Sequence, residues 1–165
     1  MTTLFLEHAN GRIAYDEAGA GPLVVCVPSM GDVRGEYRFL APRLAEAGCR
    51  VVTMDVRGHG ESSTAWDDFS VAGIGSDIVA LIRYLDGGPA VVIGDSMAAG
   101  ATVWAAAEAP ELVAGAILMG PFVRGEPTLG LSGARVRVDL AVEEDHFVAI
   151  AVVEQNRHGG PCTTS

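Results

Sequence analysis

Lysine is absent from this 165-residue chain, so its eleven basic residues are all arginines. Set against 21 Asp and Glu residues, they give a formal net charge of −10. The chain has no basic run that could follow a nucleic-acid backbone or bind an anionic lipid surface. We therefore expect no nucleic acid and no membrane among its partners.

Cysteines are few and widely spaced, at positions 26, 49 and 162. They form no CxxC pair and no cluster with metal-ligand spacing, so we expect neither a disulfide framework nor a metal site. The N-terminus has no signal-peptide pattern, and charges or prolines interrupt every apolar run before it reaches membrane-spanning length. These absences predict a cytoplasmic protein.

Apolar residues make up 49% of the sequence, which is enough for the core of one compact domain. A hairpin is predicted at 4–8 and 12–17 around Asn10-Gly11, followed by a strand at 23–28. Further strands are predicted at 50–55, 90–93 and 113–118, and helices at 42–47, 76–85 and 96–109, with Ser76 as a helix N-cap. This order predicts an α/β fold, with a mostly parallel sheet covered by helices on both faces.

The composition changes after Phe122, which divides the chain into residues 1–122 and an atypical segment, 123–165. Charged and apolar residues alternate over 135–140, as in a strand, whereas the apolar run 147–153 fits either a second strand or a helix. The tail from 158 onward is expected to be disordered. Because the strand at 113–118 would leave an open apolar edge, we expect residues 134–153 to cover it or a homodimer to form through it.

The most informative stretch is a buried strand that runs directly into Gly94-Asp95-Ser96-Met97-Ala98 and then into a helix. Small residues two before and two after Ser96 form the pattern of a nucleophile elbow, in which the serine hydroxyl projects at the positive end of a helix dipole. Placing Asp95 at the apex would put Ile93 and Met97 in the two small positions, which they do not fit. The alternative is a serine that merely caps an ordinary helix.

Two other motifs accompany the elbow: Asp-Val-Arg-Gly-His-Gly-Glu-Ser over 55–62, and the stretch 37–48 that predicts a first helix and its exit. Together the three motifs resemble the α/β-hydrolase superfamily over residues 4–122. The resemblance implies a serine hydrolase that acts on an ester or other acyl bond of a small-molecule substrate, with no cofactor. Ser96 would be the nucleophile, and the backbone N–H groups of Met97 and Met30 would form the oxyanion hole.

The sequence departs from the family pattern after the third strand, where Pro28-Ser29 stands in place of the usual His-Gly. This departure removes a side chain that orders the loop but leaves the main-chain donor. His59 occupies the variable position of the R-G-x-G loop, so we expect a loop residue rather than the catalytic base. Asp55 and Arg57 are likewise expected to order loops, and Asp95 to be structural.

The resemblance also implies an acid and a histidine that follow Ser96 in the chain. The best available pair is His146 as base and Asp139 as acid; Glu126, Asp145 and His158 are the other residues in the right order. All five also fit a solvated surface, and residues 123–165 do not resemble the remaining parts of the family.

Two explanations of this C-terminal segment stay open. The chain is either a C-terminally truncated or frame-shifted hydrolase, or a minimal variant with relocated catalytic residues. We therefore expect poor or absent ester hydrolysis, and the alternative function is that of a non-catalytic fragment or ligand-binding remnant. A nucleotide-binding Rossmann domain is disfavoured because no GxGxxG lies between a strand and a helix.

Overall fold

The computed structural model describes residues 2–121 with their side chains, and the backbone of 134–143 and 146–155. The strands are β1 (Leu4–His8), β2 (Gly11–Gly19), β3 (Leu23–Val27), β4 (Arg50–Met54), β5 (Ala90–Asp95), β6 (Val113–Met119), β7 (Ala134–Glu143) and β8 (His146–Gln155). The helices are α1 (Leu40–Glu46), α2 (Val71–Leu85) and α3 (Met97–Glu108), with one turn of 3-10 helix, η1 (Arg34–Tyr37).

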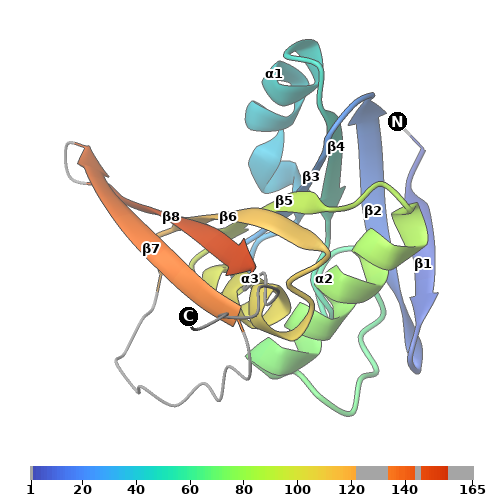
Figure 1. The fold of residues 1–165 in the computed structure, drawn as a ribbon. Helices are drawn as coiled ribbons and strands as arrows, with labels where there is room; N and C mark the ends of the chain where they lie inside the picture. The colour runs from blue at the N-terminus through green and yellow to red at the C-terminus, as the bar shows by residue number, and fades with distance from the viewer. Residues whose placement is uncertain (1, 122–133, 144–145, 156–165) are drawn as a thin grey trace, which may run out of the picture.

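One sheet runs through the described part of the molecule, in the order β1-β2-β4-β3-β5-β6-β8-β7 (Figure 1). Its central strands β4, β3, β5 and β6 are parallel, whereas β1, β2, β8 and β7 join at the two sides by antiparallel pairing. This arrangement confirms the α/β class predicted from the sequence. Parallel pairing places the carboxyl ends of β4, β3 and β5 side by side, so the loops that follow them are neighbours.

The two faces of the sheet carry separate apolar clusters. Along β3, Leu23, Val25 and Val27 belong to the cluster that also contains residues of α2 and α3. The alternate residues, Val24 and Cys26, belong to the cluster around α1. This alternation explains why the whole of β3 is apolar, since successive side chains of a strand point to opposite faces and both faces are covered.

Two local sequence predictions need correction. The first hairpin turns at Ala9-Asn10 rather than at Asn10-Gly11, because Gly11 is already paired with His8. Glycine is needed at position 11 for another reason: an added Cβ would lie 2.7 Å from the Trp66 ring. The second helix, α2, begins at Val71 rather than at Ser76. Its N-cap is Ser70, whose hydroxyl accepts the Gly73 N–H at 3.0 Å.

The glycines of α2 explain why its first turns were missed. Glycine disfavours a helix in isolation, but at Gly75 an added Cβ would lie 2.3 Å from the Trp104 ring of α3. Close packing between α2 and α3 therefore outweighs the low helix propensity of this segment.

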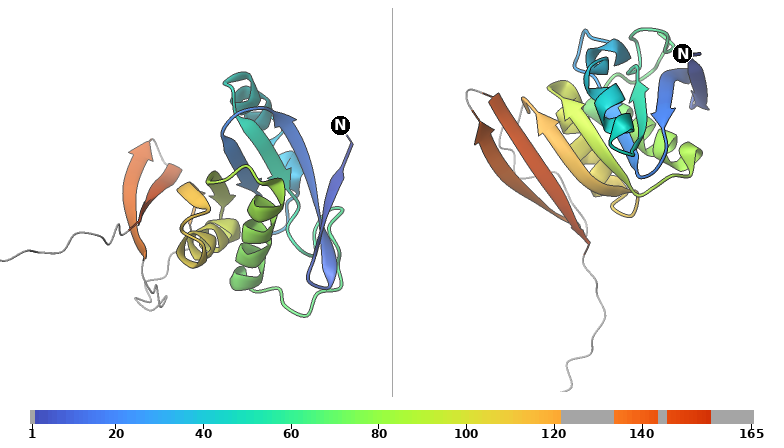
Figure 2. Two further views of the ribbon diagram at one scale, coloured as in Figure 1. Left: turned by 45° about the vertical axis from the view of Figure 1, so that its right-hand side comes forward. Right: turned by 90° about the horizontal axis from the view of Figure 1, so that it is seen from above.

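The edge of β6 is covered by the chain itself. β8 pairs antiparallel with β6, and β7 pairs with β8 over their full length, so the run 147–153 is a strand rather than a helix. Figure 2 shows this hairpin extending the sheet beyond β6. Of the two outcomes expected for this edge, the structure shows added strands, and the β6 edge is therefore not open for a homodimer.

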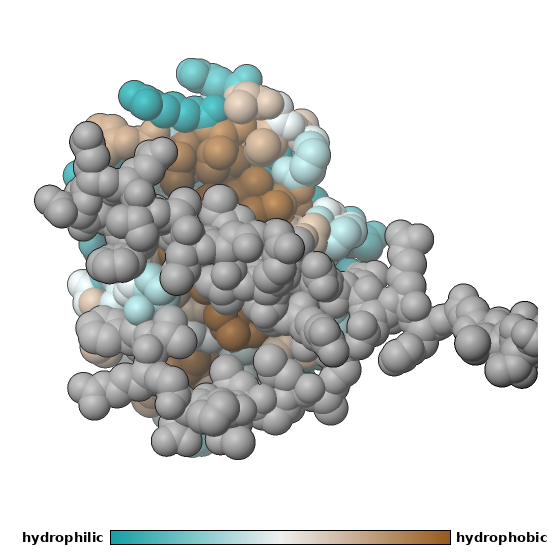
Figure 3. All heavy atoms as spheres, turned by 60° about the vertical axis from the view of Figure 1, so that its left-hand side comes forward, coloured by the Kyte–Doolittle hydropathy of each residue, from teal (hydrophilic) through white to brown (hydrophobic). Residues whose placement is uncertain are grey.

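Apolar side chains also reach the surface of the described part. Figure 3 shows brown apolar atoms between the hydrophilic residues at the top of the view and the grey atoms. The large apolar residues that are exposed are Leu4, Met30, Val33, Phe39, Phe69, Val71 and Tyr84. None of the described helices is both long and apolar enough to span a membrane.

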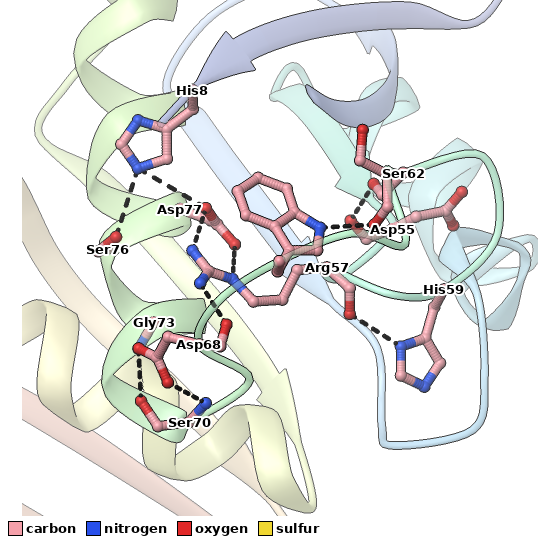
Figure 4. Close-up of polar contacts among 12 residues, drawn as sticks. His8, Asp55, Arg57, His59, Ser62, Asp68, Ser70, Gly73, Ser76 and Asp77 are labelled. Carbon is pink, nitrogen blue, oxygen red and sulfur yellow. Dashed lines mark hydrogen bonds and ion pairs between the residues drawn. The ribbon is translucent and has the colours of Figure 1, made fainter. Parts of the chain in front are cut away.

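A buried ion pair ties the loop after β4 to α2 (Figure 4). Arg57 donates two hydrogen bonds, both of 2.8 Å, to the carboxylate of Asp77, whose side chain is fully buried, and its third nitrogen donates to the Asp68 carbonyl at 2.6 Å. The Arg57 guanidinium also stacks 4.4 Å from the Trp66 ring centre. A charge taken out of water in this way is tolerated only while its partner remains.

We predict that Asp77→Ala lowers the free energy of unfolding by about 3–5 kcal/mol, because it leaves the Arg57 charge buried and unpaired. Urea unfolding followed by circular dichroism measures the change. The control is Glu111→Ala, which breaks a 3.9 Å pair with Arg83 in which both side chains are 63% exposed. Surface pairs contribute about 0–1 kcal/mol, so similar losses in the two variants would contradict a structural role for the buried pair.

Candidate active site

The backbone at Ser96 is strained in the way an elbow requires. Ser96 lies between β5 and α3 with φ 52° and ψ −111°, one of the few non-glycine residues of the described part with a positive φ. Its N–H donates to the Met119 carbonyl of β6 at 2.8 Å, and its carbonyl accepts the Ala99 N–H at 3.1 Å. The strand therefore turns into the helix at this one residue, and Ser96, not Asp95, is the apex.

The residues two before and two after Ser96 must be small for this turn to close. A Cβ added at Gly94 would lie 2.4 Å from the Thr102 hydroxyl and 2.5 Å from the Ala98 carbonyl oxygen. Ala98 is itself fully buried, and its carbonyl accepts the Thr102 hydroxyl at 2.8 Å. The small-x-Ser-x-small spacing seen in the sequence thus has a direct steric cause.

The Ser96 side chain is half-buried, and its hydroxyl has no hydrogen-bond partner among residues 2–121. The Asp95 carboxylate beside it also lacks a hydrogen bond or ion pair within that range. The imidazoles of this range belong to His8 and His59, and both are engaged elsewhere. Within residues 2–121, therefore, no side chain occupies the Ser96 hydroxyl.

The loop after β3 lies beside the elbow, because Val27 pairs with Gly94 across the adjacent parallel strands. A tight turn from Ser29 to Asp32 closes with the Asp32 N–H donating to the Ser29 carbonyl at 3.2 Å. Gly31, the third residue of this turn, has φ 89°, as in a type II turn. The hydroxyl of Tyr37 fixes the start of the loop by donating to the Val27 carbonyl at 2.8 Å.

The N–H groups of this loop are nearly all occupied. Ser29 donates to Glu36 Oε2 at 2.9 Å, Gly31 donates to His59 Nε2 at 3.1 Å, and Val33 donates to the Asp32 carboxylate at 2.8 Å. Pro28 has no N–H, and that of Asp32 closes the turn. Among residues 28–33, only the N–H of Met30 lacks a partner within residues 2–121, and Met30 is 70% exposed.

A second main-chain N–H without a partner in residues 2–121 is that of Met97, directly after Ser96. Met97 is the first residue of α3, and the first N–H groups of a helix have no acceptor within it. The Ser96 side chain does not cap this helix end. Two main-chain donors without a partner in residues 2–121, those of Met30 and Met97, therefore follow the adjacent ends of β3 and β5.

Two side chains that the sequence analysis did not single out hold this loop. Glu36 accepts both the N–H and the hydroxyl of Ser29. Burial, with smaller contributions from the Asp95 and Asp32 carboxylates, raises the pKa of Glu36 above its ordinary value. Glu36 thus supplies the loop-ordering acceptor that Pro28-Ser29 lacks, and its place in the turn of η1 gave no signal in the sequence.

Arg34 is the other missed residue, and it binds η1 to the loop after β4. Its guanidinium pairs with Asp16, Asp55 and Glu61. The backbone N–H of Arg34 also donates to the buried Asp55 carboxylate, at 2.7 Å. Asp55 also accepts the Glu61 N–H at 2.9 Å. Asp55 and Arg57 therefore order loops, as the sequence predicted.

The proposed base and acid fall on the C-terminal hairpin, whose side chains lie outside the described residues. His146 begins β8, two residues before Val148, which pairs with Met119; Met119 in turn pairs with Asp95. The backbone of His146 is thus at the carboxyl edge of the sheet, one strand beyond β6. Asp139 pairs instead with Ile150, four residues along β8, or about 13 Å from the level of His146.

Three further sequence candidates, Glu126, Asp145 and His158, lie outside the described residues. A cavity of about 480 Å³ lies elsewhere, between α1, η1 and the strands β2 and β4, with Tyr37, Ala41 and Val51 in its lining. Ser96 is not part of that lining. Within the described ranges no cluster of His, Cys, Asp and Glu could hold a metal ion.

Comparison with known proteins gives one consistent result. A family model described as alpha/beta hydrolase fold matches residues 22–138. The 2-(acetamidomethylene)succinate hydrolase of Mesorhizobium japonicum is 31% identical over 139 residues, which cover 82% of this chain and 49% of that protein. Bifunctional epoxide hydrolase 2 of Sus scrofa is 34% identical over 122 residues, which cover 72% of this chain and 22% of that protein.

Among solved structures, the thioesterase domain from the curacin biosynthetic pathway superposes with a TM-score of 0.70 and 28% identity. The match covers 76% of this chain and 48% of that one. The chain therefore spans less than half the length of each of these relatives.

We predict that Gly94→Ala lowers the free energy of unfolding by about 1–3 kcal/mol, the cost of forcing a methyl into a packed site. Gly115→Ala, in the neighbouring strand β6, is the matched control, because its Cβ would meet its nearest neighbour at an ordinary 3.9 Å. Chemical unfolding of both variants measures the difference. Equal stability of the two would contradict the steric account of the elbow.

We predict that Glu36→Gln stabilises the protein relative to the parent chain more at pH 8 than at pH 4. Because the folded-state pKa is raised, the folded state holds more protons than the unfolded chain between the ordinary pKa, about 4.3, and the raised value. The parent chain therefore loses stability as the pH rises through that window, whereas glutamine does not titrate. Urea unfolding at both pH values measures the change.

The matched control repeats Glu36→Gln in an Asp95→Asn background, because Asp95 is one of the carboxylates that raise the pKa of Glu36. The pH-dependent gain should be smaller there, since one repulsive charge has been removed. If Glu36→Gln changed the free energy of unfolding equally at both pH values, the folded state would not disfavour the charged form of Glu36, and the prediction would be wrong.

Proposed function

The chain belongs to the α/β-hydrolase fold family, and from this premise we propose that it is a serine hydrolase acting on an ester or other acyl bond of a small molecule. The observation that carries the proposal is the strained backbone at Ser96, with an unpaired hydroxyl at the apex of the turn. Strain of this kind costs about 1–3 kcal/mol and is concentrated at functional sites. An ordinary helix cap does not need it.

In the proposed reaction the Ser96 oxygen attacks the carbonyl carbon of the acyl group. The electron pair of the carbonyl bond moves to its oxygen, which becomes negative in the tetrahedral intermediate. The N–H groups of Met97 and Met30 bind that oxygen, and the lack of another acceptor for either group within residues 2–121 supports this role. When the intermediate collapses, the bond to the leaving group breaks, and that group takes up the proton that Ser96 gave to the base. Water then attacks the acyl carbon, which releases the acid and restores the Ser96 hydroxyl.

A base must accept the Ser96 proton, and His146 is the residue that we propose. The placement of its backbone at the carboxyl edge of the sheet supports this choice. Direct orientation of His146 by Asp139 is not part of the proposal, because the two are about 13 Å apart along the hairpin. Without a base the hydroxyl is a weak nucleophile, and the rate falls by several powers of ten.

A non-catalytic role as a ligand-binding protein is the alternative. The observation that favours it is the lack of an imidazole partner for Ser96 within residues 2–121. Both functions would use the same pair of main-chain donors, but only the hydrolase forms a covalent bond to Ser96.

We predict that a fluorophosphonate probe labels the full chain at Ser96, slowly compared with a hydrolase that has a complete triad. Ser96→Ala should abolish the labelling because it removes the attacking oxygen. His146→Ala should slow it by about 10³-fold or more if His146 is the base. Gel fluorescence gives the rate, and mass spectrometry of the labelled peptide gives the site.

Asp95→Asn is the matched control, since it changes the adjacent side chain and leaves the serine in place. It should keep the labelling, because Asp95 is not the apex of the turn. No labelling of the parent chain, or labelling that survives Ser96→Ala, would overturn the proposed hydrolase.

A further inference from the structure

We propose that His59 is a positioning residue that holds the loop after β3 so that the Met30 N–H faces the substrate, an inference that rests on the proposed function. His59 lies in the loop after β4, which is adjacent to the loop after β3 because the two strands pair in parallel. Its ring bridges the two loops. Nε2 accepts the Gly31 N–H at 3.1 Å. Nδ1 lies 3.2 Å from the Arg57 carbonyl, a contact drawn in Figure 4.

The two contacts fix the state of the ring. A carbonyl oxygen can only accept, so Nδ1 carries the proton and donates to Arg57. Nε2 then holds a lone pair, which is what the Gly31 N–H requires. The tautomer that satisfies both contacts therefore has its proton on Nδ1 and its lone pair on Nε2, and neither ring nitrogen is free to act as a base for Ser96.

The loop that carries His59 is firmly held, so the histidine can act as a fixed point. The His59 N–H donates to the Val56 carbonyl at 3.0 Å, and the Gly58 N–H donates to the Ser63 carbonyl at 2.9 Å. The buried Ser62 hydroxyl donates to the Asp55 carbonyl at 2.8 Å. An acceptor on such a loop is held in place without a large further loss of side-chain entropy.

The hydrogen bond to Gly31 acts on one particular peptide. Type I and type II turns differ mainly in the orientation of the peptide between their second and third residues, here Met30 and Gly31. By holding the Gly31 N–H, His59 keeps that peptide in the type II orientation, while Glu36 holds Ser29 on the other side. The Met30 N–H between them is left free, as a donor to an oxyanion must be.

The test compares His59→Phe, which removes the acceptor, with His59→Gln, whose side-chain oxygen can replace Nε2. Backbone amide exchange by NMR should show Gly31 exchanging about tenfold faster in the Phe variant, as expected for the loss of one hydrogen bond. The Met30 amide resonance should shift with it. The Gln variant should restore both signals, and the imidazole nitrogen shifts of the parent chain should show a proton on Nδ1.

The second readout is the rate of fluorophosphonate labelling. His59→Phe should slow it by about 10- to 100-fold, since a misplaced donor costs that much, and His59→Gln should recover most of the rate. His8→Gln is the control, because His8 contacts Ser76 and Asp77 on α2 rather than the loop after β3. It should leave the exchange of Gly31 unchanged.

Unchanged Gly31 exchange in His59→Phe, or labelling as fast as in the parent chain, overturns the inference. So does a Gln variant that behaves like the Phe variant, because the effect would then be one of packing rather than of a hydrogen bond. If the parent chain is not labelled at all, the proposed hydrolase fails. The Gly31 amide still decides whether His59 holds the loop.

Discussion

The positive φ of Ser96 is the constraint on which the rest of the site depends. A non-glycine residue in this conformation is strained, and it persists because its surroundings allow no other path for the chain. The Met119 carbonyl of β6 holds its N–H, and the space beside Gly94 is taken by Ala98 and Thr102. The elbow is therefore a property of three elements, β5, β6 and α3, rather than of the five-residue motif alone.

Charged and polar side chains order the loops around the elbow and connect them to one another. Asp55 and Arg34 join the loop after β4 to η1, and Arg57 joins the same loop to α2 through Asp77. Glu36 and His59 extend this ordering to the loop after β3. A loop held by several hydrogen bonds keeps its remaining N–H groups in fixed directions, which is what preorganised binding of an oxyanion requires.

The sequence predicted those features that depend on neighbouring residues. The apolar runs located the strands, and the spacing around Ser96 located the turn, because its steric requirement lies within five residues. The start of α2 was missed because it depends on contact between Gly75 and Trp104, which are distant in sequence. Arg34 was missed for the same reason, since Asp16, Asp55 and Glu61 become its neighbours only in the folded sheet. Glu36 lies only seven residues from Ser29, but no sequence pattern marks their hydrogen bonds.

The proposed oxyanion donors and the proposed base differ in how far strand pairing determines their positions. The proposed oxyanion donors are main-chain groups in segments that continue directly from β3 and β5, so strand pairing brings the segments of Met30 and Met97 side by side. The base is a side chain from a separate segment, and its position depends on how β8 joins the sheet. Register places the backbone of His146 at the correct edge, but proton transfer requires contact within about 3 Å. Strand pairing is therefore sufficient to identify where an oxyanion would bind, whereas activation of Ser96 depends on a side-chain geometry that pairing does not determine.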